Sequence, residues 1–188
     1  MIVLWTTLTV MAWFIGLVIY FFIRGAIDPM AGNWLATTIA GLIASIPLGV
    51  AQGMVARGYV PPSIWTVATM MGVLPGIHLF DQGYKLLSYE PPAFTYGIIF
   101  GLGLGVAQYL VLRGTYTRAW WWFISSVLCY FVAFLSLGLF AVWAIPEGAD
   151  GTSLFPLWLF GIPLIVGGIG GLGTGVAWAF LKSEGNHR

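Results

Sequence analysis

Apolar residues run along this chain in six long stretches, separated by short clusters of polar, charged and helix-breaking residues. A helix needs roughly 20 mostly apolar residues to cross a bilayer core of about 30 Å, and the stretches have about this length. The pattern therefore predicts an all-α polytopic integral membrane protein with about six transmembrane helices. The stretches are Ile2–Ile23, Trp34–Ala56, Ser63–Phe80, Phe94–Leu112, Ala119–Ile145 and Ser153–Leu181.

Proline and glycine mark the ends of these stretches. Pro61-Pro62 and Pro91-Pro92 follow the second and third stretches, and a helix cannot continue through two residues that lack the backbone donor. Inside the last stretch, Gly161 and Pro163 predict either a kink or a short interfacial segment over 155–160. The first stretch has no Lys or Arg before it and no small-residue cleavage site, so we expect a retained helix and not a signal peptide.

The amino-acid composition is typical of an integral membrane protein. Hydrophobic residues make up 60% of the 188 residues and charged residues only 7%, whereas a soluble domain carries about 25% charged residues. The net charge of +1 argues against nucleic acid as a partner, because neutralising phosphates requires a basic patch. Cys129 is the single cysteine, so no disulfide framework can form within the chain. We expect one transmembrane domain over 1–188, with the lipid bilayer as its main partner.

Basic residues are distributed unequally between the two membrane faces. Lys and Arg in short loops mark the cytoplasmic side of a membrane protein. The face reached by the ends of the second, fourth and sixth stretches carries five basic residues, and the opposite face carries two. This predicts a multi-pass membrane protein with both termini in the cytoplasm. The five are Arg57, Arg113, Arg118, Lys182 and Arg188, and the two are Arg24 and Lys85.

An internal repeat is the most specific feature of the chain. The tetrapeptide Gly-Val-Ala-Gln that ends at Gln52 recurs 56 residues later, ending at Gln108. In the same way Arg57 recurs as Arg113, and we expect Trp65 to recur as Trp121. A partial third copy has Gly-Val-Ala followed by Trp178 in place of the glutamine. The chain is therefore expected to form three helical hairpins, over 1–57, 63–113 and 119–182.

Small residues at a spacing of four form a ridge in each copy. Such residues lie along one helix face and let two backbones approach closely. We expect the second, fourth and sixth helices to pack together in the centre, with the more aromatic odd-numbered helices outside and a pseudo-threefold axis along the membrane normal. The ridges are Gly41, Ser45 and Gly49; Gly97, Gly101 and Gly105; and Gly167, Gly171 and Gly175.

Glutamine and tryptophan are two kinds of side chain in the apolar stretches that can form hydrogen bonds. The amides of Gln52 and Gln108 lie within the apolar stretches, where hydrocarbon offers no hydrogen-bond partner. They either hydrogen-bond between repeats or line a path for a substrate or ion. Six tryptophans near stretch ends are expected to form an aromatic belt at headgroup level, namely Trp34, Trp65, Trp120, Trp121, Trp122 and Trp143.

The motif G-x-x-x-G-x-x-Q-x-x-x-x-R occurs here as Gly101 to Arg113, with Trp120-Trp121-Trp122 beyond it. In this motif the chain resembles a group of uncharacterised small polytopic membrane proteins from bacteria, including phototrophs. The likeness covers about a third of the chain, and the altered third copy lies outside it. The resemblance implies a membrane-embedded helical protein of the bacterial cytoplasmic membrane and transfers no catalytic residue.

Candidate chemistry is sparse. No nucleophile–base pair, metal-binding set or phosphate-binding loop occurs in the sequence, so no catalytic or metal-ligating residue is assigned. His78, Asp81 and Gln82 share a helix face at the end of the third stretch. They form an interfacial cap or interhelical contact, a site for a ligand or partner, or, through the histidine, a metal or pigment ligand. No cofactor is required by the sequence, although contact with a quinone, pigment or lipid is compatible with it.

Two classes of function fit these features. The first is an accessory or scaffold subunit of a larger bacterial membrane complex, for example in respiratory or photosynthetic electron transfer, because the mid-span residues are almost wholly apolar. In that case the partners are other membrane-protein subunits. The alternative is a small transporter or membrane-embedded substrate-binding subunit, with a polar pocket near His78.

Overall fold

The described part of the chain contains six helices long and apolar enough to cross a membrane, as the hydrophobic pattern predicts. The computed structural model describes residues 1–31, 33–87, 92–144 and 157–185, and it describes side chains over 1–27, 33–80, 92–143 and 159–181. These residues contain no β-strand, which confirms the all-α fold class. The elements are α1 (Ile2–Ala31), α2 (Asn33–Val55), α3 (Pro62–Leu87), α4 (Ala93–Leu112), α5 (Trp120–Ala144), η1 (Leu157–Gly167) and α6 (Gly168–Gly185).

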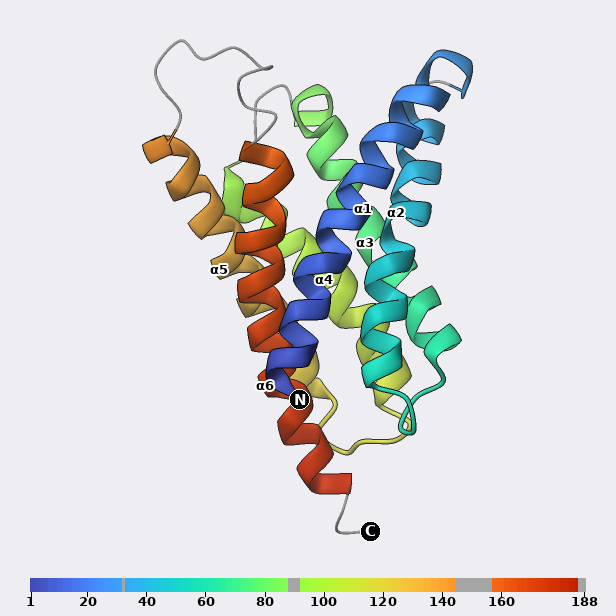
Figure 1. Cartoon of the computed structure of the whole chain (residues 1–188), viewed down its shortest axis with the longest axis vertical. Helices are drawn as coiled ribbons and strands as arrows, with labels where there is room; N and C mark the ends of the chain where they lie inside the picture. The colour runs from blue at the N-terminus through green and yellow to red at the C-terminus, as the bar shows by residue number, and fades with distance from the viewer. Residues whose placement is uncertain (32, 88–91, 145–156, 186–188) are drawn as a thin grey trace.

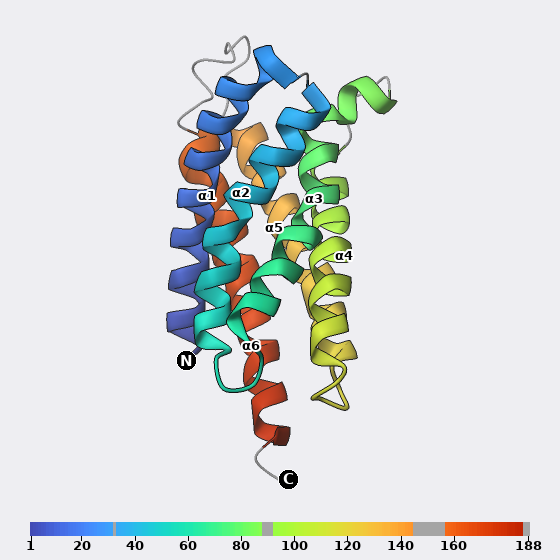
Figure 2. The same cartoon turned by 90° about the vertical axis from the view of Figure 1, so that its right-hand side faces the viewer.

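The helices form a closed ring in chain order. Each helix packs against the helices before and after it, and α6 with η1 packs against both α5 and α1. Figure 2 shows α1, α2, α3 and α4 side by side, with α5 and α6 behind them. The start of α1 and the end of α6 lie at the same end of the bundle, called here the terminal end (Figure 1).

The ring corrects the expected arrangement of the even-numbered helices. No backbone contact joins α2, α4 and α6 to one another among the described residues, so they do not form a central bundle. The small-residue ridges instead face the next helix along the ring. A Cβ added to Gly49 on α2 would lie 2.7 Å from Thr66 Cα on α3, and one added to Gly101 on α4 would lie 2.6 Å from Val127 Cα on α5.

The third ridge closes the ring. A Cβ on Gly167 would lie 3.0 Å from Val10 Cα on α1, and one on Gly171 would lie 3.2 Å from Thr6 Cα on the same helix. Each ridge thus joins one hairpin to the next, and the last joins the third hairpin to the first. The repeat explains the ring, because three copies of one interface that are related by rotation close on themselves.

Proline sets the helix boundaries much as expected. Pro62 is the first residue of α3, where its missing N–H costs no helical hydrogen bond, and Pro92 precedes α4 with an extended backbone (φ −55°, ψ 145°). The turn between α2 and α3 uses Gly58 at φ 100°, a conformation that residues with a Cβ rarely adopt. At the last span, Pro163 lies inside the π-helical segment η1, which widens the turn ahead of α6.

Candidate functional site

Gln52 and Gln108 meet inside the ring, toward its terminal end. Both side chains are buried, and the amide nitrogen of Gln108 donates to the side-chain oxygen of Gln52 over 3.3 Å. The same nitrogen donates to Thr69 Oγ1 over 2.9 Å, and the amide of Gln52 donates to Thr9 Oγ1 over 3.4 Å. Of the two expected roles, the geometry is that of interhelical hydrogen bonding, which supplies the partners that hydrocarbon lacks.

Tryptophans complete the same layer in a repeating pattern. The indole of Trp65 on α3 donates to Gln52 on α2 over 3.4 Å, and the indole of Trp122 on α5 donates to Gln108 on α4 over 3.1 Å. Across the closure of the ring, Trp5 on α1 donates to Thr174 Oγ1 on α6 over 3.1 Å. Each odd-numbered helix therefore donates one indole N–H to the even-numbered helix before it. The three indole donors follow the repeat, although the third acceptor, Thr174, lies four residues before the position of the two glutamines.

The altered third copy changes this layer at Trp178. An indole occupies the position of the glutamine, and it stacks on Trp5 with ring centroids 5.8 Å apart and planes at 14°. Gln52 and Gln108 each donate to a hydroxyl on the helix before their own, but the hydroxyl of Ser126 on α5 has no hydrogen-bond partner among the described residues. The third copy thus exchanges a hydrogen-bonding amide for aromatic packing.

Four tryptophans close the interior of the ring. Their indoles lie edge to face or stacked with centroids 5.4–6.3 Å apart, which are favourable geometries for aromatic pairs. Leu112 and Leu181 pack into the same cluster. We call this set the tryptophan plug, and it consists of Trp5, Trp65, Trp122 and Trp178.

The plug corrects two expectations about tryptophan. Trp65 and Trp122 are 0% exposed, so they belong to the core and not to an interfacial belt. The structural counterpart of Trp65 is Trp122 and not Trp121, because the connection into α5 is one residue longer than the connection into α3. The remaining proposed belt residues, which are Trp34, Trp120, Trp121 and Trp143, do face outward.

An apolar cavity of about 60 Å³ lies inside the ring beyond the plug. Residues from α1, α2, α3, α4, α5 and η1 line it, and on α1 they run from Ala12 to Phe21, about 13 Å of helix axis. Six of the lining side chains are aromatic, and the hydroxyl of Ser45 bonds the backbone oxygen of Leu42. The cavity is therefore narrow and elongated, and its lining is apolar apart from the hydroxyls of Tyr20 and Ser45 and the indole nitrogen of Trp13.

His78 lies apart from this interior. Its Nε2 is 3.0 Å from Thr38 Oγ1, and its ring stacks on Trp34 with centroids 3.9 Å apart. Trp34 is largely exposed, so this contact between α2 and α3 is on the outer surface of the ring. The side chains of Asp81 and Gln82, which were expected to join His78, lie outside the described residues.

Sequence reasoning missed half of the hydrogen-bonded layer. Trp5, Thr9, Thr69 and Thr174 were not singled out, although a signal for most of them is present. Tryptophan followed four residues later by threonine or serine occurs on each odd-numbered helix, at Trp5, Trp65 and Trp122, although other tryptophans of the chain match the same spacing. Within the described residues, no cluster of three or more His, Cys, Asp and Glu side chains could hold a metal ion.

Comparison with known proteins gave no match. No protein-family model fits the chain, and no curated protein and no solved structure is significantly similar to it.

Proposed function

We propose that the chain is an accessory or scaffold subunit of a larger bacterial membrane complex, which binds a helix of another subunit on its outer surface. The observation that carries this proposal is an exposed aromatic surface at the end of α5 remote from the termini. There Trp143 is 84% exposed and Phe140 37% exposed, and their rings are 6.4 Å apart. Figure 1 shows this end of α5 leaning away from the other helices.

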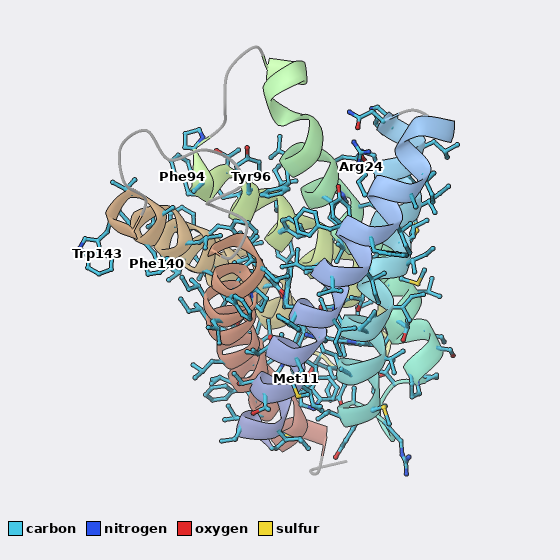
Figure 3. All side chains as sticks on the ribbon, turned by 45° about the horizontal axis from the view of Figure 1, so that its top comes forward. Met11, Arg24, Phe94, Tyr96, Phe140 and Trp143 are labelled. Atoms are coloured by element: carbon cyan, nitrogen blue, oxygen red, sulfur yellow. The ribbon has the colours of Figure 1, made fainter. Side chains whose placement is uncertain are left out.

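The neighbouring start of α4 extends this surface. Phe94 is partly exposed and lies edge to face with Phe131 on α5, with centroids 6.1 Å apart. Figure 3 shows Phe94, Phe140 and Trp143 at the same end of the molecule, with Trp143 pointing outward. Large aromatic side chains are the residues that dominate protein–protein contacts, so this surface suits a partner helix.

The interior supports the same proposal. The two buried amides of the layer and three of its indoles, those of Trp5, Trp65 and Trp122, are hydrogen-bonded between helices, and the tryptophan plug fills the ring at its terminal end. Such a closed, internally bonded ring is a rigid support rather than a pair of moving halves around a midplane site. In this proposal the five basic residues of the terminal face place both termini in the cytoplasm.

The test is extraction from native membranes in a mild detergent, followed by native electrophoresis and mass spectrometry of the band. We expect the chain to migrate with other membrane subunits, and the double substitution Phe140→Ala with Trp143→Ala to release it. The matched control is Phe22→Ala, which removes a similarly exposed aromatic ring from α1. Migration of the native chain alone would contradict the proposal, as would equal release by both variants.

A second candidate is a membrane-embedded subunit that binds a lipophilic molecule in the ring cavity. The lining is apolar, so it favours an apolar compound over a polar solute. The volume of about 60 Å³ is below the roughly 300–1,000 Å³ of ligand pockets, so only the end of a slender chain, as in an isoprenoid quinone or a lipid, fits inside. Val73 is buried and lines the cavity, whereas Val67 on the same helix faces outward.

Organic extraction of the purified protein and mass spectrometry test this candidate. We expect a stoichiometric apolar compound with the native chain and with Val67→Phe, and its loss with Val73→Phe, which fills the cavity. Its identity separates a quinone from a lipid. No retained compound, or equal retention by both variants, would rule out a ligand in the cavity.

A further inference from the structure

A second hollow lies on the outer surface of the ring, between α5 and α6 at the terminal end. Its volume is about 490 Å³. The side chains of Trp121, Val176 and Phe180 form apolar walls and are all substantially exposed, and Arg118 lies at one end. This hollow, called here the α5–α6 groove, is separate from the aromatic surface at the far end of α5.

The internal repeat explains why a groove opens at this seam. Between α3 and α4, Gly72 and Gly103 bring two backbones into contact, since a Cβ on Gly72 would lie 2.8 Å from Gly103 O. At the same positions of the third copy stand Cys129 and Gly173, and a Cβ on Gly173 would meet the Cys129 side chain, not its backbone. The cysteine side chain therefore stands between α5 and α6 where glycine allows direct contact between α3 and α4.

The residues around the groove suit a lipid that has an anionic headgroup. Arg118 lies two residues before the start of α5, where the exposed indoles of Trp120 and Trp121 stack on each other. Tryptophans at the ends of membrane spans are typical of the headgroup layer. A guanidinium binds phosphate oxygens in pairs, and apolar walls accommodate an acyl chain. The two connections on this membrane face, 56–61 and 113–119, carry Arg57, Arg113 and Arg118 and no acidic residue.

We propose that the α5–α6 groove binds an anionic phospholipid of the leaflet on the terminal side. The phosphate and the anionic head lie at Arg118, and one acyl chain lies between Trp121 and Phe180 along Val176. The net charge of the head matters because this membrane face carries five basic residues against Glu184, and the resulting positive charge attracts anionic over zwitterionic lipids. This site is independent of the partner surface in the proposed function.

Native mass spectrometry of the whole, delipidated chain in a mild detergent tests the site. The chain is titrated with phosphatidylglycerol or with phosphatidylcholine of the same acyl chains. We expect selective retention of one phosphatidylglycerol and about a fivefold loss of its affinity with Arg118→Gln. The matched control Arg57→Gln removes an exposed cation of the same membrane face outside the groove, and it should lower the affinity much less than Arg118→Gln because Arg57 acts only through the screened field of the face.

A second pair of variants tests the groove itself. Val176→Phe fills it, whereas Val106→Phe places the same ring at the equivalent position of the second copy, which is also exposed. Only Val176→Phe should abolish retention. Equal retention of the two lipids, equal loss with both arginine variants, or no effect of Val176→Phe would overturn the proposal. If Arg118→Gln fails to fold, Arg118→Lys keeps the charge without the paired geometry and should give a partial loss.

Discussion

The side-chain nitrogen of Gln108 lies 3.3 Å from the side-chain oxygen of Gln52, the residue 56 positions earlier that occupies the same place in the repeat. Equivalent residues of two copies thus meet directly across the ring interior. Around them, the indoles of Trp65 and Trp122 donate to the two glutamines in the same sense. In this layer, residues that are equivalent in the sequence repeat are in direct contact.

Replacing Gln108 by leucine should destabilise the protein by roughly 1–2 kcal/mol. The substitution removes the acceptor of Trp122 and the donor to Thr69, and it leaves the buried indole N–H without a partner. Gln52→Leu should cost less, because its bonds to Thr9 and Trp65 are both 3.4 Å long. Equilibrium unfolding in mixed micelles measures both, and the double variant should cost less than the sum of the two. A strictly additive double variant would show that the two amides do not interact.

A methyl group on the α4 ridge should separate α4 from α5. A Cβ on Gly101 would lie 2.6 Å from Val127 Cα, a distance that neither backbone can accept without moving. Gly101→Ala should therefore lower the thermal unfolding temperature. A Cβ added to Gly25 on α1 would meet nothing within 4 Å, so Gly25→Ala should be neutral or slightly stabilising because alanine favours a helix. The same effect from both substitutions would mean that the ridge contact is unimportant.

Removing Trp178 should open a hole at the centre of the tryptophan plug. Its ring contacts Trp5, Trp65 and Trp122, and Trp→Ala substitutions at such buried sites cost about 3–5 kcal/mol. Trp143→Ala removes the same side chain from an exposed position and should change the stability of the isolated protein very little. Unfolding followed by tryptophan fluorescence compares the two variants. A small effect at Trp178 would show that the plug does not hold the ring together.

Stability should fall at high pH because of Tyr116, in the connection between α4 and α5. Burial, and in second place the nearby Tyr59, raises the pKa of Tyr116 from 10.0 to about 12. Between pH 10 and about pH 12, the Tyr116 phenol is deprotonated in the unfolded chain but still protonated in the folded chain. The free energy of unfolding therefore decreases as pH rises through this range. Below pH 10 the group contributes no pH dependence.

Tyr116→Phe should weaken this loss of stability between pH 10 and 12. The described residues offer the Tyr116 hydroxyl no hydrogen-bond partner, so the substitution should cost little at pH 7. Thermal unfolding of both proteins at pH 7, 9 and 11.5 provides the measurement. Parallel loss of stability in the two proteins at pH 11.5 would assign the effect to other groups.

Several elements could be predicted because they depend on local sequence. Helix starts at Pro62 and Ala93 follow from proline chemistry, and the spans follow from apolar length. The burial of Trp65 could not be predicted, because a tryptophan near the end of a span can point either to the membrane interface or to the protein interior. The rotation of its helix decides between these, and that rotation depends on where Gly49 finds a neighbouring backbone.

Sequence by itself determined that this protein crosses the membrane with six helices, that its three hairpins repeat one another, and that each even-numbered helix carries a small-residue ridge. These properties reside in apolar length and in spacing along one helix, which are local. Only the tertiary structure decided that the ridges join successive hairpins into a closed ring, and that tryptophans and glutamines fill its interior. Small residues show that a close neighbour exists, but the identity of that neighbour depends on the packing of all six helices at once.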